Sequence, residues 1–249
     1  MATLTSLRGR SGYSPSDRPH DDLHHRSMSR TSPKPRRPLV PLVLIGAAVA
    51  VTSACGVNVE FDETVAQEFD LAAFDSVAVE APFDVTIRRG DVQRVEVEVG
   101  ERSIDNLIVE VVDGELRLDL DSSFTTSDLV ATITTTDLTA VHASGASEVV
   151  LPDLDVDDLV LDLEGASHVR TSGVIDHLDL SLSGASSADM VGTEIASVNI
   201  DFSGASSAGF DNSVDEIAGS ISGASDLSVA GSTNVRVDTS GAAGINRGG

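Results

Sequence analysis

Hydrophobic and polar residues alternate along most of the second half of the chain, and short Gly-Ala motifs interrupt the alternation at regular intervals. The residues two, four and six positions before these glycines are apolar in most copies, and the fourth residue after the glycine is apolar in every copy. Alternation with a period of two indicates a strand that buries one face. Each repeat is therefore expected to supply two short strands joined by a Gly-Ala corner.

The Gly-Ala motif occurs six times, most often as Ser-Gly-Ala-Ser, with intervals of 20, 19, 20, 19 and 18 residues between successive glycines. The repeated glycines are Gly145, Gly165, Gly184, Gly204, Gly223 and Gly241. A unit of this length cannot close a core of its own, so it must stack on its neighbours. The sequence thus predicts an all-β, parallel solenoid whose rungs contain about 20 residues and lie roughly 4.8 Å apart.

The corner motif contains residue types that suit this stacking. Glycine permits a backbone conformation that is closed to other residues. We expect the small alanine to fit an inward-facing corner, and the serine hydroxyls to bond backbone groups of adjacent rungs. A flexible Gly-Ser linker is the alternative interpretation, but the apolar alternation between the motifs argues against it.

The preceding segment, residues 69–120, also shows the alternation of β-strands. Arg89-Gly90-Asp91 and Asp113-Gly114 mark turns in it, and the second is a common hairpin dipeptide. No stretch is long enough and periodic enough at 3.6 residues to predict a helix. We expect this segment to be an irregular first part of the same solenoid that covers its N-terminal end.

The first 55 residues have the layout of a bacterial export signal. A basic stretch is followed by 16 uncharged, mainly apolar residues, 39–54, and then by Cys55. A transmembrane helix needs about 20 residues, so a cleaved signal fits better than a permanent span. Val51-Thr52-Ser53-Ala54 resembles the lipobox of bacterial lipoproteins, although Thr52 replaces the usual leucine. Translation could start at Met1 or at Met28.

Cys55 is the only cysteine of the chain, so it is available for acylation and leaves no partner for a disulfide. We expect it to anchor the protein in the cell membrane, facing outside the cytoplasm. The predicted organisation is a cytoplasmic leader and signal peptide at 1–54, the acylated cysteine and a linker at 55–68, and a solenoid domain at 69–249.

Charge and composition narrow the range of partners. From Cys55 onward the chain has 8 arginines, no lysine and 37 Asp and Glu, a formal charge of −29. Nucleic acid is excluded as a partner because phosphate binding needs the opposite sign. Anionic headgroups would also repel the domain, so the lipid must provide the membrane attachment. The exported part also lacks Trp and Tyr, on which sugars and bases stack.

The sequence offers only weak candidates for chemistry. Asp153, Asp155 and Asp157 occupy the first ligand positions of a calcium-loop template, but Asp158 stands where the template requires glycine, so no metal site is predicted. Ser167-His168 suggests a nucleophile and a base, yet the same serine recurs without a histidine. We expect no catalytic residue and no cofactor.

Several segments in order resemble the putative auto-transporter adhesin head GIN domain family. They are Phe74-Asp75-Ser76-Val77, Phe83-Asp84-Val85-Thr86-Ile87, Asp113-Gly114-Glu115-Leu116, Thr132-Ile133-Thr134, the Ser-Gly-Ala-Ser series and Gly244-Ile245-Asn246. The resemblance covers about residues 70–249. It implies a right-handed β-helix-like solenoid on the cell envelope, with no established activity and no catalytic residues to transfer.

The leading functional hypothesis is a non-catalytic cell-envelope lipoprotein that presents a solenoid surface for adhesion, scaffolding or ligand binding. Its partners would be the membrane, through the lipid, and an unidentified envelope or extracellular ligand, while its oligomeric state is left open. The alternative is a polysaccharide-processing β-helix enzyme. Such an enzyme needs a cleft with a clustered acid and base, and the repeats contain no insertion that would build one.

Overall fold

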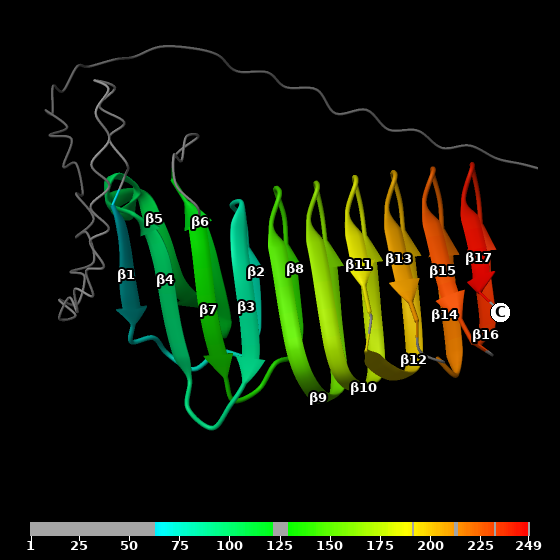
Figure 1. The fold of residues 1–249 in the computed structure, drawn as a ribbon, viewed down its shortest axis with the longest axis horizontal. Coiled ribbons are helices and arrows are strands. Elements are labelled where there is room, and N and C mark those ends of the chain that lie inside the picture. Colours follow the sequence, from blue (N-terminus) through cyan, green and yellow to red (C-terminus); the bar gives the residue numbers. More distant parts are fainter. Residues whose placement is uncertain (1–62, 122–128, 191, 212–213, 232, 249) are drawn as a thin grey trace, which may run out of the picture. The chain divides into compact units, whose positions relative to one another are not determined.

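The computed structural model describes residues 63–121, 129–190, 192–211, 214–231 and 233–248. They all lie in the second of the two units into which the chain divides, residues 39–249. The predicted signal peptide and Cys55 lie outside the described residues. Seventeen strands of this part form one continuous hydrogen-bonded sheet, coiled into a stack of rungs (Figure 1). No helix in the described part is long and apolar enough to cross a membrane.

The strands fall into two groups. The first group is β1 (Thr64–Phe69), β2 (Ser76–Val79), β3 (Phe83–Arg89), β4 (Arg94–Gly100), β5 (Leu107–Val112), β6 (Glu115–Leu120) and β7 (Leu129–Thr135). The second group is β8 (Ala140–Ala143), β9 (Glu148–Leu163), β10 (His168–Leu182), β11 (Ser187–Asp189), β12 (Thr193–Phe202), β13 (Ser207–Phe210), β14 (Glu216–Ile221), β15 (Asp226–Ala230), β16 (Asn234–Thr239) and β17 (Gly244–Gly248). We call the first group the cap and the second the repeat rungs.

The repeat rungs confirm the predicted all-β solenoid with about 20 residues per turn. On the first face, β8 pairs with the end of β9, and then β9, β10, β12, β14 and β16 pair in parallel. On the second face, the parallel order is β10, β11, β13, β15 and β17. Equivalent residues of successive rungs are direct partners, as Leu161 and Leu180 are. The Gly-Ala corners connect the two faces.

The core runs between the two faces and contains the apolar residues that the alternation predicted. Leu159, Leu161 and Leu163 of β9 are at most 1% exposed, and their β10 partners Leu178 and Leu180 are at most 2% exposed. Burial of a leucine side chain contributes about 1.5–3 kcal/mol. Because each rung repeats the same inward positions, every rung buries its apolar residues against those of the next.

The cap is irregular, as expected, and closes the N-terminal end of the stack. Strand β7 lies between β3, to which it is parallel, and β4, to which it is antiparallel. Strand β1 pairs antiparallel with the far side of β4, at the opposite end of the stack from β16 and β17 (Figure 1). The β5–β6 hairpin turns at Asp113 and Gly114, which both have positive φ, as this dipeptide predicted.

Two local features of the cap differ from the sequence interpretation. The predicted linker, 55–68, is wrong over its last residues, because Thr64–Phe69 forms β1. This segment can be a strand because it lies at the edge of the sheet, where its polar side chains stay in water while β4 supplies backbone partners. A short 3₁₀ helix, Glu101–Asn106, also connects β4 to β5.

Candidate functional site

The stacked corners form one continuous ridge along the repeat rungs. After the first corner, the N–H group of each corner alanine donates to the carbonyl of the glycine one rung earlier, as from Ala205 to Gly184 at 2.7 Å. Gly204 has a φ of +78°, and a Cβ atom placed on it would lie 2.4 Å from the Gly184 oxygen. Only glycine fits this position, because both the backbone conformation and the spacing of the rungs exclude a side chain.

The corner residues point in the opposite directions to those we expected. The alanines, such as Ala205, are exposed, and the serines that follow them are buried, with Ser206 only 1% exposed. The Ser206 hydroxyl donates to the carbonyl of Ser203 in its own corner, at 2.7 Å. A buried hydroxyl must find an acceptor, and the carbonyl three residues earlier is the nearest. The inward corner position therefore holds a small residue, which is serine in five copies and Ala243 in the last.

Some corner serines also form hydrogen bonds between rungs. The Ser222 hydroxyl donates to the Phe202 carbonyl at 3.1 Å, one rung earlier. The Ser147 hydroxyl can donate to the carbonyl of Ala81 in the cap at 2.8 Å or to that of Ser144 in its own corner at 2.9 Å. The inward Ser225 hydroxyl accepts from the Ser206 N–H at 3.3 Å, also one rung earlier. The prediction that serine hydroxyls bond adjacent rungs is thus correct for these residues, whereas the hydroxyls of Ser167, Ser186 and Ser206 donate within their own corners.

The outward side chains of the first face form columns that run across the rungs. The column three residues before each corner glycine consists of His142, Asp162, Ser181, Asp201, Ser220 and Asp238. Neighbours within the columns bond each other: Ser220 donates to Asp201 at 3.0 Å, and Asn199 donates to Asp179 at 3.2 Å. We call the outward side of β9, β10, β12, β14 and β16 the column face.

Cationic partners are scarce on this surface. Arg236 pairs with Glu216 at 2.8 Å, Arg170 pairs with Glu148, and Arg117 pairs with Glu80 at 2.8 Å. The hydrogen bond and the charge of Glu80 raise the pKa of Arg117 above its ordinary value. With 8 arginines against 37 carboxylates after residue 54, most of the acidic groups have no positive neighbour. The solenoid therefore carries a strong negative field.

The weak metal candidates do not come together. Asp153, Asp155 and Asp157 all lie on β9 and are exposed, and Leu154 between the first two points inward. Alternate residues of a strand are about 6.6–7 Å apart along the chain, whereas calcium ligands surround one ion at about 2.3–2.6 Å. Within the described residues, no group of three or more acidic, His or Cys side chains could hold a metal ion.

The two histidines of β10 have separate hydrogen-bond partners. His168 Nδ1 lies 2.6 Å from the hydroxyl of Ser187, and His177 Nδ1 lies 2.7 Å from that of Ser197. The hydroxyl of Ser167 instead donates to the carbonyl of Glu164 at 2.8 Å. Ser167 and His168 therefore have separate hydrogen-bond partners, which agrees with a structural role for the serine.

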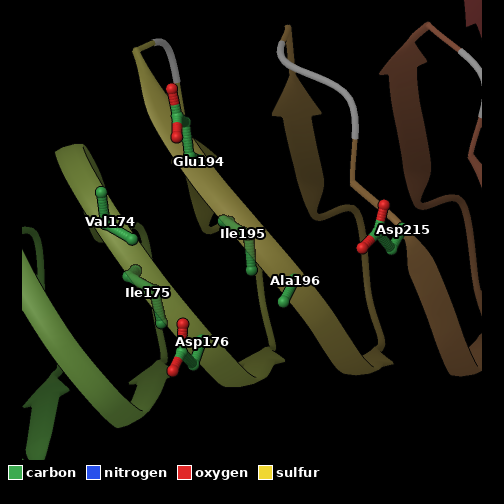
Figure 2. A pocket seen from close by; sticks show the side chains of 7 residues that line it. All are labelled: Val174, Ile175, Asp176, Glu194, Ile195, Ala196 and Asp215. Carbon is green, nitrogen blue, oxygen red and sulfur yellow. The ribbon is translucent and has the colours of Figure 1, made fainter.

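The repeat rungs contain a shallow groove that sequence reasoning missed. It has a volume of about 440 Å³ and is lined by Val174, Ile175, Asp176, Glu194, Ile195, Ala196 and Asp215. Figure 2 shows its three carboxylates around the apolar Ile195 and Ala196. Val174 at this groove is 42% exposed, and its neighbours on the adjacent strands, Asp155 and Glu194, are both acidic. The lining places three carboxylates beside apolar side chains, so the groove suits a ligand with cationic groups.

A second groove of about 430 Å³ lies near the last rungs on the second face. It includes Phe210, Asp211, Val229 and Arg247. Its lining residues come from β11, β13, β15 and β17 and the residues next to them, so it is a depression across neighbouring rungs. The acidic residues and Arg247 give it mixed charge.

Comparison with solved structures supports the fold. An adhesin described as putative from Bacteroides fragilis is 14% identical, with a TM-score of 0.60 over 75% of this chain and 98% of that one. Putative adhesins from Parabacteroides distasonis and Parabacteroides merdae are 16% and 15% identical, with TM-scores of 0.51 and 0.50, and each comparison covers 75% of this chain and 97% of the other. At these identities the likeness shows the fold alone. No curated protein sequence matches the chain.

The sequence itself identifies the family. Residues 73–249 match the family described as "Putative auto-transporter adhesin, head GIN domain". This range contains nearly all of the cap and every repeat rung, and it agrees with the resemblance seen in the separate motifs. The chain therefore belongs to the putative auto-transporter adhesin, head GIN domain family.

Proposed function

We propose that this protein is a non-catalytic, lipid-anchored cell-envelope protein that binds an extended, positively charged ligand along its column face. The descriptions of its family and structural relatives as adhesins suggest a surface protein without enzymatic activity. The finer elements of the proposal are the acyl anchor at Cys55 and the chemistry of the ligand. They rest on the sequence before the solenoid and on the charge of its rungs.

The observation that carries the proposal is the column that contains Asp162, Asp201 and Asp238. Backbone pairing fixes these carboxylates at regular intervals along the stack. A rigid row of like charges can bind a polymer through many weak contacts at once, because each contact after the first is intramolecular. The scarcity of arginine on the same face favours a ligand that carries the positive charge.

A binding assay with charged polymers tests the ligand proposal. The full-length protein is compared on immobilised cationic, neutral and anionic polymers, at low and at high salt. We expect binding to the cationic polymer alone, and a marked loss at high salt because the contacts are exposed. The variant Asp162→Asn, Asp201→Asn, Asp238→Asn should bind more weakly.

The matched control is a variant with three neutralised carboxylates in the cap, Asp84→Asn, Glu96→Gln and Glu98→Gln. It has the same net charge as the column variant, so a general effect of charge would weaken both equally. An equal loss in the two variants would contradict a role for the column face. Binding to the neutral or anionic polymer instead would overturn the proposed ligand class.

A single substitution tests the anchor. Replacing Cys55 with serine removes the only thiol that an acyl transferase could modify. We expect the variant to leave the detergent phase or to keep its signal segment, with a corresponding change in mass. Unchanged detergent partitioning together with an unchanged mass would contradict lipidation at this residue.

A further inference from the structure

The last rung presents an open strand edge on the first face. Asn234 donates its N–H to the carbonyl of Asp215 at 3.1 Å, and Ser240 donates to Ile221 at 2.9 Å. In a parallel strand, residues whose backbone groups point to one neighbour alternate with residues whose groups point to the other side. The N–H and C=O groups of Val235, Val237 and Thr239 therefore face away from β14. Within the described ranges, no strand pairs with this side of β16.

The other strand of the last rung is protected in a different way. Arg247 of β17 follows Phe210 and Val229 in an inward column, so a charged side chain stands where earlier rungs place apolar ones. An inward-pointing charge is a device that keeps an edge strand from pairing. Strand β16 has Val235 and Val237 at its inward positions instead. Its edge is therefore the one suited to pairing.

We propose that β16 pairs antiparallel with β16 of a second copy of this chain, about a twofold axis that passes beside Val237. In this register Val237 lies opposite its own equivalent, and Val235 lies opposite Thr239 of the second copy. All three residues have their free backbone groups on the open side, so the pairing satisfies them. The inward side chains of the two copies then lie on the same side of the joined sheet.

Charge complementarity selects this register. It places Arg236 of each copy opposite Asp238 of the other, on the outward side, which gives two pairs of unlike charges. A slip of two residues in one direction would place Arg236 opposite Arg236, and a slip in the other would place Asp238 opposite Asp238. A slip of one residue would place the inward residues of one copy opposite outward residues of the other. Like charges directly opposite each other are destabilising, so only the proposed register is favoured.

The two side chains are available for these contacts. The Arg236 side chain is 66% exposed and already contacts Glu216, but a guanidinium has five N–H donors and can serve both acids. Asp238 is exposed and has no ion-pair partner among the described residues. The Arg236–Asp238 positions are also the pairs without backbone bonds between them, where opposite side chains lie closest.

Charge reversal tests the interface. The dissociation constant of the full-length protein is measured in detergent by sedimentation equilibrium. We expect a dimer, and we expect Asp238→Arg to raise the dissociation constant about tenfold or more, because it turns two attractive pairs into repulsive ones. Arg236→Asp should have the same effect. The double variant Arg236→Asp, Asp238→Arg should dimerise as the natural protein does.

Asp201→Arg is the matched control, because Asp201 stands in the same column on a strand that is paired on both sides. It should leave the dissociation constant unchanged. A monomeric natural protein, an equal effect of the control, or a double variant that stays monomeric would each overturn the proposal.

Cysteine cross-linking tests the register independently. Arg236→Cys and Asp238→Cys are prepared separately in full-length protein that also carries Cys55→Ser, so each has one thiol. Oxidation of the two proteins mixed together should give a disulfide-linked heterodimer, whereas neither protein alone should cross-link. Cross-linking of either variant with itself would show a different register, and no cross-linking in the mixture would show that the two strands do not meet.

Discussion

The cap and the repeat rungs use the same kind of strand but connect their strands differently. In the rungs, each strand pairs with the strand that occupies the same position one turn later, as β12 does with β14 and β14 with β16. In the cap, β7 inserts between β3 and β4, and β1 pairs with β4. The rungs are therefore nearly interchangeable, whereas each cap strand has a unique place.

This difference has an energetic consequence. Each rung contacts only its neighbours, so its contribution to stability is approximately a sum of its own and its interface terms. The cap pairs β2 and β3 in parallel with the first repeat rung, and its other strands pair among themselves, partly antiparallel, from separated parts of the chain. Loss of a cap strand would expose a strand edge and apolar core, while loss of one complete rung would rejoin two equivalent surfaces.

The largest expected effect comes from deletions that test whether the rungs are interchangeable. Removal of residues 184–203 joins Ser183 to Gly204 and keeps every column in register. That protein should fold cooperatively with modestly lower stability. Removal of residues 184–193 alone shifts all later rungs by half a turn relative to the earlier ones. Polar positions would then enter the core, so this protein should be unfolded or aggregated. Circular dichroism and size-exclusion chromatography distinguish the two outcomes. If both deletions unfold alike, the rungs are not independent units.

A smaller effect is expected from a methyl group in the corner ridge. Gly204→Ala forces a positive φ on alanine and places its Cβ against the Gly184 carbonyl. The left-handed conformation alone costs about 1–2 kcal/mol, and the clash adds to it. Gly209→Ala is the control, because a Cβ atom placed on Gly209 would have no other atom within 4 Å. Chemical denaturation should show a clear loss of stability for the first variant and a change within about 0.5 kcal/mol for the second. Equal losses would mean that the ridge is not tightly stacked.

Buried hydroxyls give the third effect and compare the two regions directly. Thr135 of the cap donates to the carbonyl of Asp137 at 2.7 Å or to that of Phe74 at 3.1 Å. Ser206 of the rungs has a single acceptor, Ser203. We expect Thr135→Val and Ser206→Ala each to lower the free energy of unfolding by about 1–3 kcal/mol, since each leaves carbonyl groups without this donor. Ser207→Ala, at an exposed position, should be nearly neutral, and a comparable loss there would contradict this explanation.

The smallest effect is expected at the exposed ion pair of Arg117 and Glu80. Glu80→Gln removes the charge that raises the pKa of Arg117. Because a raised pKa keeps the arginine protonated well above neutrality, the pair should stabilise the fold equally throughout the neutral range, and on the alkaline side it should be lost only at extreme pH. The melting temperature should fall slightly at low salt and match that of the natural protein at about 0.5 M salt. A large fall that persists at high salt would indicate a packing role for Glu80.

Periodicity was sufficient to predict the rungs because the same local pattern occurs six times. Leu159, Leu161 and Leu163 alternate as a buried strand must, and the six glycines fix the length of a turn. The orientation of the corner could not be derived in the same way. Alanine and serine are both small, and only the stacked backbone shows that Ser206 points inward while Ala205 points outward.

The arrangement of the cap also lay beyond local patterns. Strands β3, β4 and β7 could be recognised from their alternation, but nothing within each segment indicates that β7 lies between the other two. Likewise, residues 55–68 were interpreted as a linker, and only the presence of β4 makes Thr64–Phe69 a strand. The groove around Val174 depends on side chains from three rungs, so its shape could not be read from any one of them.

The direction of the backbone hydrogen bonds between rungs has a mechanical consequence. These bonds run along the axis of the stack, from Ala205 to Gly184 and from Ala224 to Gly204. Tension at the C-terminal end would load the bonds of the last rung first, because that rung has a neighbour on one side only. We expect the chain to peel away turn by turn, and each turn of about 20 residues would release roughly 70 Å of extended chain. Such stepwise yielding would absorb work under load, while the interlocked cap would be the last part to give way.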